Sequence, residues 1–316
     1  MQPSTLRNTA PLKSLSPQHA RTSKLPAAST VIRFDELERR LADTENRALL
    51  YRHEEFKQQL FERINRLLDD RSILSLDVFD TLVIRDNSSE ITRFLEVSKK
   101  IAAELNKQQP SRELQAIDMF LARYLGTKAS YRASPAVKGC REGSLTEIYR
   151  TAARLLEIDT DPKHLIDIEI GNEVERIEPN EALIEYAENH VAKGGRVLLL
   201  TDMYMHAEQV RKLLDALAIP TTITEHLISS ADTKVSKASG KIFDVAETYF
   251  RSSSDEFVHL GDSINGDYKK AITHGWRALH LPVSKKDIQQ RRQDHLSTAE
   301  TIRSDYGITT SIAIPR

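Results

Sequence analysis

Residues 73–79 read ILSLDVF, and this stretch decides the fold. A short apolar run with β-branched and aromatic residues is typical of a buried strand. Similar runs follow at 196–201 (RVLLLT), 226–230 (HLISS), 256–260 (EFVHL) and 277–281 (RALHL), and helical patterns separate these last four. Strands that alternate with helices predict an α/β fold, here a doubly wound, mostly parallel Rossmann-like sheet with helices on both faces.

The interval between the first two predicted strands is about 115 residues, far longer than a simple crossover connection. We therefore predict an inserted domain at 87–178, with the core formed by 71–86 and 179–282. The insertion has helical periodicity throughout. Within it, Ser144 followed by Glu147 has the pattern of a capping box at the start of a helix.

The two ends of the chain have different compositions. Residues 1–30 contain four basic residues, no acidic residue and several Pro, Ser and Thr, which predicts a disordered basic tail rather than a transit peptide. Residues 31–70 carry apolar side chains three and four positions apart. This spacing predicts helices that either pack on the main domain or mediate self-association. Residues 283–316 are predicted to be a polar tail.

Composition excludes several classes of protein. Lys plus Arg number 45 and Asp plus Glu number 46, and this balance argues against a nucleic-acid-binding protein. A single cysteine, Cys140, excludes a disulfide framework and a cysteine-based zinc site and fits a cytoplasmic setting. No uncharged window approaches the roughly 20 apolar residues of a membrane-spanning helix, so we expect no membrane span.

Polar side chains follow four of the predicted strands. Asp77 and Asp80 end the first run, Thr201 ends the second, Lys237 follows the third and Asp262 follows the fourth. The carboxyl ends of parallel strands share one edge of a sheet, where ligands bind near the point at which strand order reverses. One Asp after a strand is often only a turn residue. Together and in this order, these residues predict an active site.

These residues resemble the four motifs of the haloacid dehalogenase superfamily, whose members are mostly phosphohydrolases. The matching positions are Asp77 with Thr81 and Leu82, then Thr201, then Lys237 ahead of Gly240-Lys-Ile-Phe243, and finally GDSINGD at 261–267. The resemblance covers about residues 73–282. It implies that the helical insertion is a cap of the type called C1.

Longer stretches resemble one branch of that superfamily. These are DVFDTLVIR at 77–85, TDMYM at 201–205 and SKASGKIF at 236–243. The branch contains predicted hydrolases found with glycosyltransferases in bacterial polysaccharide systems. The likeness implies a phosphorylated small-molecule substrate, such as a sugar phosphate or a glycan precursor. It also implies a glycosyltransferase as a partner for the N-terminal helices.

The resemblance implies a role for each matching residue. Asp77 is the nucleophile that forms an aspartyl-phosphate. Lys237 neutralises charge and keeps Asp77 ionised, because a nearby cation lowers the pKa of a carboxyl group. Thr201 and Thr81 bind the phosphoryl group. Arg85, just after the first motif, is a substrate contact or a surface ion pair.

The implied cofactor is Mg²⁺, which prefers oxygen ligands. Its ligands would be the carboxylates of Asp77 and Asp262 and the backbone carbonyl of Phe79. Asp267 would hold either the metal ligands or Lys237 in position without itself binding the metal. An Mg²⁺ ion bridging nucleophile and phosphate would reduce the repulsion between them.

One position departs from the phosphatase pattern. Most phosphatases of the superfamily have a second Asp two residues after the nucleophile, as general acid and then base, but here that residue is Phe79. Either Asp80 replaces the acid, or the site has none, because the residue at the place of Asp80 normally points away from the phosphate. An aromatic residue here is found in the family's metal-independent dehalogenases, which is an alternative function. A weakly active scaffold for a glycosyltransferase is another.

Overall fold

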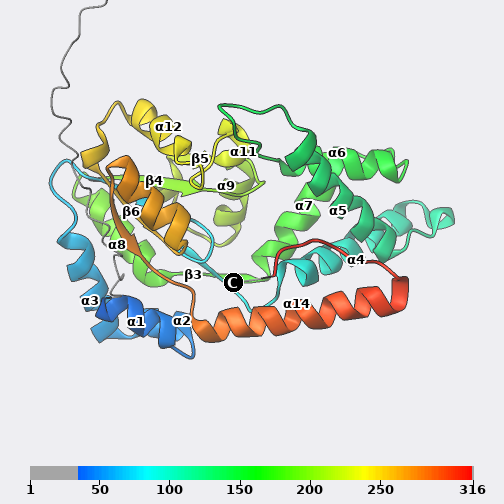
Figure 1. Cartoon of the computed structure of the whole chain (residues 1–316), viewed down its shortest axis with the longest axis horizontal. Helices are drawn as coiled ribbons and strands as arrows, with labels where there is room; N and C mark the ends of the chain where they lie inside the picture. The colour runs from blue at the N-terminus through cyan, green and yellow to red at the C-terminus, as the bar shows by residue number, and fades with distance from the viewer. Residues whose placement is uncertain (1–34, 315–316) are drawn as a thin grey trace, which may run out of the picture. The chain divides into compact units, whose positions relative to one another are not determined.

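A five-stranded parallel sheet forms the centre of the computed structural model, which describes residues 35–314 (Figure 1). The strands are β1 (Ile73–Leu76), β4 (Arg196–Thr201), β5 (Leu227–Ser229), β6 (Phe257–Gly261) and β7 (Arg277–His280). They lie in the order β5-β4-β1-β6-β7, and all neighbours are parallel. The predicted α/β fold class is confirmed, and each predicted strand is present. The tail predicted at 1–30 lies outside the described residues.

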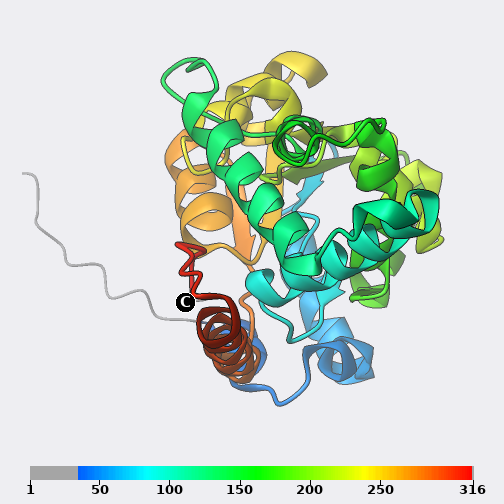
Figure 2. The ribbon, with the colours of Figure 1, turned by 90° about the vertical axis from the view of Figure 1, so that its right-hand side faces the viewer.

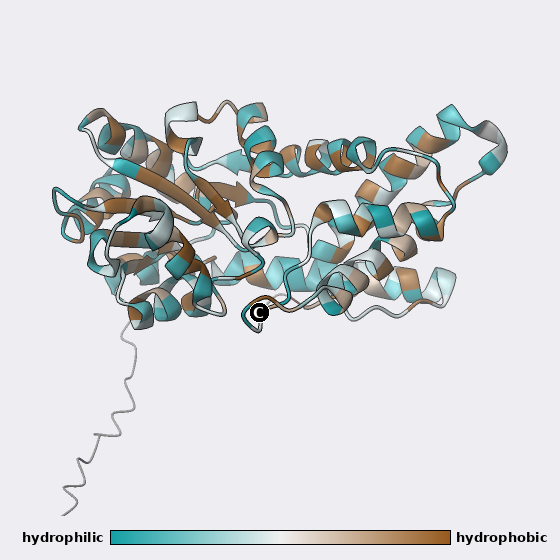
Figure 3. Cartoon of the chain, turned by 90° about the horizontal axis from the view of Figure 1, so that it is seen from above, coloured by the Kyte–Doolittle hydropathy of each residue, from teal (hydrophilic) through white to brown (hydrophobic). Residues whose placement is uncertain are grey.

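Successive residues of each strand enter two different hydrophobic cores. In β4, Val197 and Leu199 join one core, whereas Leu198 and Leu200 join the other. Side chains alternate between the faces of a strand, so a run buried on both faces is apolar without interruption. In Figure 3 the strands of the sheet are largely brown, the colour of hydrophobic residues. Burial on both faces is the physical reason why strands such as RVLLLT could be predicted from the sequence.

The strand order places β1 where the chain changes direction across the sheet. From β1 the chain continues to β4 and β5 on one side, and then to β6 and β7 on the other. Loops that leave neighbouring strands in opposite directions open a crevice at the carboxyl edge. The residues that follow β1, β4 and β6 therefore share this crevice.

Residues 87–178 form four helices, α4 (Glu90–Gln108), α5 (Ala116–Ala133), α6 (Leu145–Leu155) and α7 (Pro162–Val174), with a short 3₁₀ turn at Pro110–Arg112. They pack on one another and, in Figures 1 and 2, form a helical group beside the sheet. Ser144 caps α6 by accepting from the backbone N–H of Glu147. The predicted capping box is incomplete, because the Glu147 carboxylate accepts instead from Ser130 Oγ, at 2.8 Å.

A small antiparallel pair, β2 (Val83–Arg85) and β3 (Ile177–Pro179), joins the points at which the chain leaves the sheet and returns to it. This pair was not predicted, since strands of three residues are too short to show a periodicity. The helices between β3 and the end of the sheet are α8 (Glu181–Ala192), α9 (Ala207–Ala216), α10 (Thr221–Thr224), α11 (Ser230–Thr233), α12 (Lys241–Phe250) and α13 (Lys270–His274). The same part of the chain contains a 3₁₀ turn (Ser254–Glu256) and a π-helical turn (Ile264–Lys269).

The N-terminal segment forms α1 (Glu36–Asp43), α2 (Arg47–Arg52) and α3 (Glu54–Asn65). Its apolar side chains, including Leu41 and Phe56, are buried in the same core as alternate residues of the sheet. The apolar stripes are therefore used within the chain. Of the two interpretations of 31–70, packing on the main domain is the one that the structure supports.

The C-terminal segment is folded rather than a simple polar tail. Residues Lys285–Tyr306 form α14, a 22-residue helix that packs against α4 and α1. Its buried face consists largely of polar side chains four positions apart, Asp287, Arg291 and His295. The prediction of a polar tail was wrong, because the buried side of this helix consists mainly of polar side chains and shows no apolar periodicity. None of the helices among residues 35–314 is long and apolar enough to cross a membrane.

Candidate active site

The predicted nucleophile, Asp77, directly follows β1 and is buried at the carboxyl edge of the sheet. Its backbone N–H donates to the carbonyl of Leu260 in β6, at 2.8 Å, which fixes where the side chain emerges. The Nζ atom of Lys237 contacts Oδ1 of Asp77 and donates to the carbonyl of Leu200, at 3.1 Å. The structure thus brings together the ends of three adjacent strands and a lysine 160 positions along the chain.

Asp262 and Asp267, from the predicted fourth motif, complete an acidic cluster around Asp77. Oxygen atoms of the three carboxylates lie within 4.8 Å of one another. The Lys237 ammonium lies 2.7 Å from Oδ1 of Asp267. Three carboxylates around one ammonium leave excess negative charge, and oxygen donors suit Mg²⁺. The side chains therefore fit the predicted ion, while the contribution of the Phe79 carbonyl stays a prediction.

Burial governs the ionisation of the acidic cluster. It raises the pKa of Asp77 to about 7; the Lys237 ammonium opposes this rise, and the Asp267 carboxylate adds to it. Burial and the neighbouring carboxylates also hold the pKa of Asp262 well above its usual range. Lys237 lowers the pKa of Asp77, which is the direction that the role implied for it requires. A second cation at this position would favour the carboxylate form.

Asp267 is held by three donors. Besides Lys237, it accepts from the Nε2–H of His259 at 3.1 Å and from the backbone N–H of Ser263 at 2.9 Å. Burial lowers the pKa of His259, so its ring is neutral near pH 7. A neutral ring that donates through Nε2 must accept at Nδ1, and the Ser75 hydroxyl lies there at 2.8 Å. His259 is thus a buried core histidine, as its strand position indicates, and it also orients Asp267.

Gly261 is required by the approach of this carboxylate. A Cβ atom at position 261 would lie 2.3 Å from Cγ of Asp267, far inside van der Waals contact. The glycine of the GDS motif therefore leaves room for the side chain that anchors Lys237. Next to it, the backbone carbonyl of Asp262 accepts from Nε2 of His280, at 2.9 Å, a contact from β7 that sequence reasoning missed.

The two predicted phosphoryl-binding threonines are both buried. Thr201 ends β4, two residues after Leu199, which pairs with Leu76 just before Asp77. The Oγ1 atom of Thr81 has no hydrogen-bond partner among residues 35–314. A buried hydroxyl without a partner carries a free-energy cost that a bound oxyanion would remove. This observation supports Thr81 as a ligand contact.

Asp80 lies in a separate, arginine-rich cluster. Its carboxylate accepts from Arg47 Nη2 at 2.6 Å and from both terminal nitrogens of Arg291, at 2.8 and 3.0 Å. Arg47 also donates to the Asp80 carbonyl, and the residue adopts φ +61°, in the left-handed region. Although burial opposes it, these guanidinium groups hold the pKa of Asp80 far below its usual range.

A general acid must hold a proton near neutral pH. Asp80 does not, and its carboxylate is occupied by Arg47 and Arg291. The suggestion that Asp80 replaces the missing acid is therefore not supported by its geometry. Arg47 and Arg291 were not predicted as site residues, because they lie on α2 and α14, away from every strand end.

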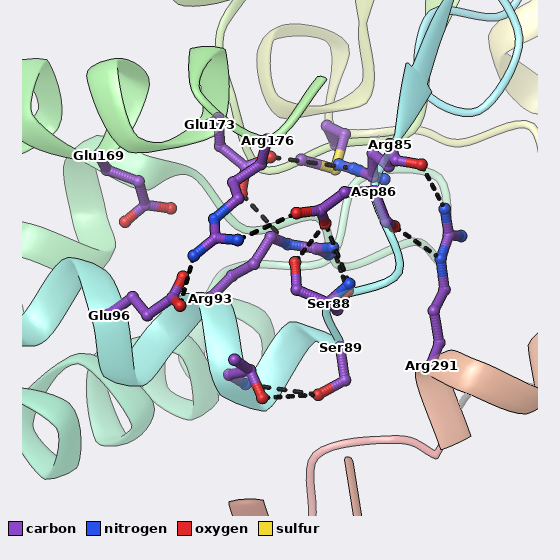
Figure 4. Close-up of polar contacts among 12 residues, drawn as sticks. Arg85, Asp86, Ser88, Ser89, Arg93, Glu96, Glu169, Glu173, Arg176 and Arg291 are labelled. Carbon is purple, nitrogen blue, oxygen red and sulfur yellow. Dashed lines mark hydrogen bonds and ion pairs between the residues drawn. The ribbon is translucent and has the colours of Figure 1, made fainter. Parts of the chain in front are cut away.

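Further ion pairs surround the segment that leads into the insertion (Figure 4). Arg93 on α4 lies 3.3 Å from Glu173 on α7, and Arg176 lies 3.1 Å from Asp86. Arg291 reaches the same segment, where it donates to the carbonyl of Asp86 at 3.1 Å. The two chain crossings between sheet and insertion are thus tied together by charge.

No known family matches the sequence, and a search of curated proteins finds no relative. Several solved structures are similar to this chain. A HAD phosphatase from Thermococcus onnurineus is 15% identical and covers 66% of this chain and 85% of its own, with a TM-score of 0.42. A HAD family enzyme from Bacteroides thetaiotaomicron, solved with magnesium and inorganic phosphate, is 16% identical and covers 66% and 93%, with a TM-score of 0.43. A 2-haloacid dehalogenase from Pseudomonas syringae is 16% identical and covers 66% and 85%, with a TM-score of 0.40.

Proposed function

We propose that the protein is a Mg²⁺-dependent phosphohydrolase that works through an aspartyl-phosphate on Asp77. The observation that carries this proposal is the buried contact of Asp77 with Lys237, inside a cluster that also contains Asp262 and Asp267. A purely structural ion pair needs one carboxylate for each ammonium. In this proposal a bound cation balances the surplus carboxylates.

In this proposal each residue acts through a stated atom. The Oδ atom of Asp77 attacks phosphorus, and water then hydrolyses the aspartyl-phosphate. Lys237 Nζ and the hydroxyls of Thr201 and Thr81 bind the phosphoryl oxygens. Asp267 keeps Lys237 directed at Asp77. A bound Mg²⁺, held by Asp77, Asp262 and the Phe79 carbonyl, would reduce the repulsion between nucleophile and phosphate.

The substrate in this proposal is a phosphorylated small molecule, and the helical insertion at 87–178 is the cap that covers it. Asp77 is 6% exposed and Lys237 is 3% exposed, and in this proposal movement of the cap admits the substrate. The insertion is joined to the core beside the site, where the N–H of Leu145 donates to the carbonyl of Tyr204, at 2.6 Å. Closure of a cap expels water from a reaction site. The core would then comprise 71–86 and 179–282.

Phe79 removes the usual proton donor, and Asp80 does not replace it. General acid catalysis is typically worth about 10²–10⁴-fold. We therefore expect rapid turnover only of substrates whose leaving group departs without a proton. Sugar phosphates, with alkoxide leaving groups, would react slowly.

The same aromatic residue also favours a second candidate, a metal-independent dehalogenase. One experiment separates the two. The purified chain is assayed with an aryl phosphate and with a 2-haloacid, each with Mg²⁺ and after exhaustive chelation. Phosphate release that requires Mg²⁺ would support the phosphohydrolase. Halide release that survives chelation would replace it with the dehalogenase. If neither product forms, the scaffold alternative gains support.

A further inference from the structure

The place beside Phe79 holds a cation where a proton donor would be expected. The guanidinium carbon of Arg85, on β2, lies 4.2 Å from the centroid of the Phe79 ring. Its Nη2 atom lies 3.6 Å from Sδ of Met203. Phe79 comes two residues after Asp77, and Met203 comes two residues after Thr201. Because β1 and β4 are adjacent parallel strands, the guanidinium spans the gap between the loops that follow them.

Arg85 is only weakly engaged by the protein. Its closest carboxylate distances are 3.8 Å, from Nε to Glu173, and 4.0 Å, from Nη1 to Asp80. The buried Nε atom has no hydrogen-bond partner among residues 35–314. Arg291, which also contacts Asp80, has distances of 2.8 and 3.0 Å to that carboxylate (Figure 4 shows both arginines). The charge of Asp80 is thus already matched, and Arg85 keeps donors available for a ligand.

We infer that Arg85 binds the leaving group of the substrate, and that this group is a phosphate, so that the substrate is a phosphoanhydride. The inference rests on the phosphohydrolase function proposed above. A phosphoryl group held between Asp77 and Thr201 would direct its leaving oxygen toward the space between Phe79 and Met203. A guanidinium group there can bind a phosphate through two parallel N–H donors, but it does not release a proton. The site therefore suits a leaving group that is already anionic.

Neither step of this reaction needs a general acid. The bond from Asp77 Oδ to phosphorus forms as the bridging P–O bond breaks, and the electron pair of that bond stays on the departing phosphate. Arg85 stabilises the added charge. In the second step a water oxygen bonds to phosphorus, the P–Oδ bond breaks and the Asp77 carboxylate is regenerated. One proton of that water remains on the new P–OH group, and the other passes to an oxygen of the released phosphate.

The test compares two substrates that differ in the charge of the leaving group. Pyrophosphate and an aryl phosphate are assayed with Mg²⁺, with the aryl group chosen so that its phenol is about as acidic as phosphate. In Arg85→Gln, kcat/KM for pyrophosphate should fall about 10- to 100-fold, the range for loss of a charged hydrogen bond. The aryl phosphate should lose about threefold or less. Arg85→Lys should restore part of the loss. Arg176→Gln, in the same ion-pair network but away from Phe79, is the matched control.

The outcomes separate this inference from the function on which it rests. If wild type hydrolyses the aryl phosphate with Mg²⁺ but not pyrophosphate, the phosphohydrolase stands and the inference on Arg85 fails. Equal losses for both substrates in Arg85→Gln would also overturn it, since a structural role affects both alike. If wild type hydrolyses neither substrate, the proposed function itself fails.

Discussion

Asp77 and Asp80 are three residues apart on one loop and are both buried, yet their surroundings have opposite character. Asp77 lies among carboxylates with one lysine, and its pKa is raised to about 7. Asp80 lies among arginines, and its pKa is far below the usual range. Burial alone would raise both. The difference shows that the partners decide the role: the first carboxylate is left open to further cations, and the second is neutralised within the chain.

The largest effect is expected from Asp77→Asn, which removes the nucleophile and leaves the side-chain volume nearly unchanged. Turnover of an aryl phosphate should fall by about 10⁴-fold or more, as for loss of other covalent nucleophiles. Steady-state assays with circular dichroism measure activity and fold together. Asp80→Asn is the matched comparison, and it should retain far more activity. Near-normal turnover in Asp77→Asn would end the covalent mechanism.

The arginine cluster should matter chiefly for stability. Arg47→Ala leaves Asp287 without its guanidinium partner and removes one of the two that hold Asp80, and breaking a buried ion pair typically costs about 3–5 kcal/mol. Urea unfolding gives the free-energy difference. Arg52 lies on the same helix and is about half exposed, with partners on the surface. Arg52→Ala should therefore cost only about 0–1 kcal/mol. Similar losses in the two variants would show that the cluster adds no special stability.

An intermediate effect is expected from Gly261→Ala. The added methyl group would overlap Asp267 and displace the carboxylate that holds Lys237. A displacement of about 1 Å near a reacting centre can cost about 10²-fold in rate. The measured quantity is kcat for the aryl phosphate. Gly171→Ala is the control, because a Cβ there meets no atom within 4 Å. Unchanged kcat in Gly261→Ala would show that the position of Asp267 is not critical.

The smallest effect concerns the dependence of stability on pH. The pKa shifts of Asp77 and Asp80 have opposite signs, so their contributions to stability change in opposite directions with pH. The lowered pKa of Asp80 contributes stability above its unfolded value of about 4, and this is lost as pH falls below it. The stability advantage of wild type over Asp80→Asn should therefore shrink below about pH 4. The raised pKa of Asp77 favours folding at low pH, so this contribution is lost as pH rises from about 4 to about 7 in metal-free protein. Urea unfolding of wild type, Asp77→Asn and Asp80→Asn, measured across pH 3–8 with a chelator present, checks both trends. Parallel pH profiles of stability for the two variants would contradict them.

The sheet and the acidic cluster were predictable because their signals are local and chemical. A few consecutive residues are enough to predict an apolar strand that ends in Asp77 or a Gly-Asp-Ser turn ahead of Asp267. The contacts of Arg47 and Arg291 with Asp80 were not predictable. They join residues 33 and 211 positions apart and leave no periodic trace. Likewise, α14 has its buried stripe in charged residues, where a search for apolar spacing finds nothing.

The contact of Arg291 with Asp80 has a consequence for the order in which the protein is made. A ribosome synthesises the loop that carries Asp77 and Asp80 long before it synthesises α14, which lies after β7 along the chain. Domains generally fold as they are released, N-terminal parts first. Here the sheet can form while Asp80 still lacks two of its closest donors, both from Arg291. The loop after the nucleophile therefore gains these contacts only after α14 has been made, and a chain released before that would carry Asp77 while Asp80 lacks Arg291.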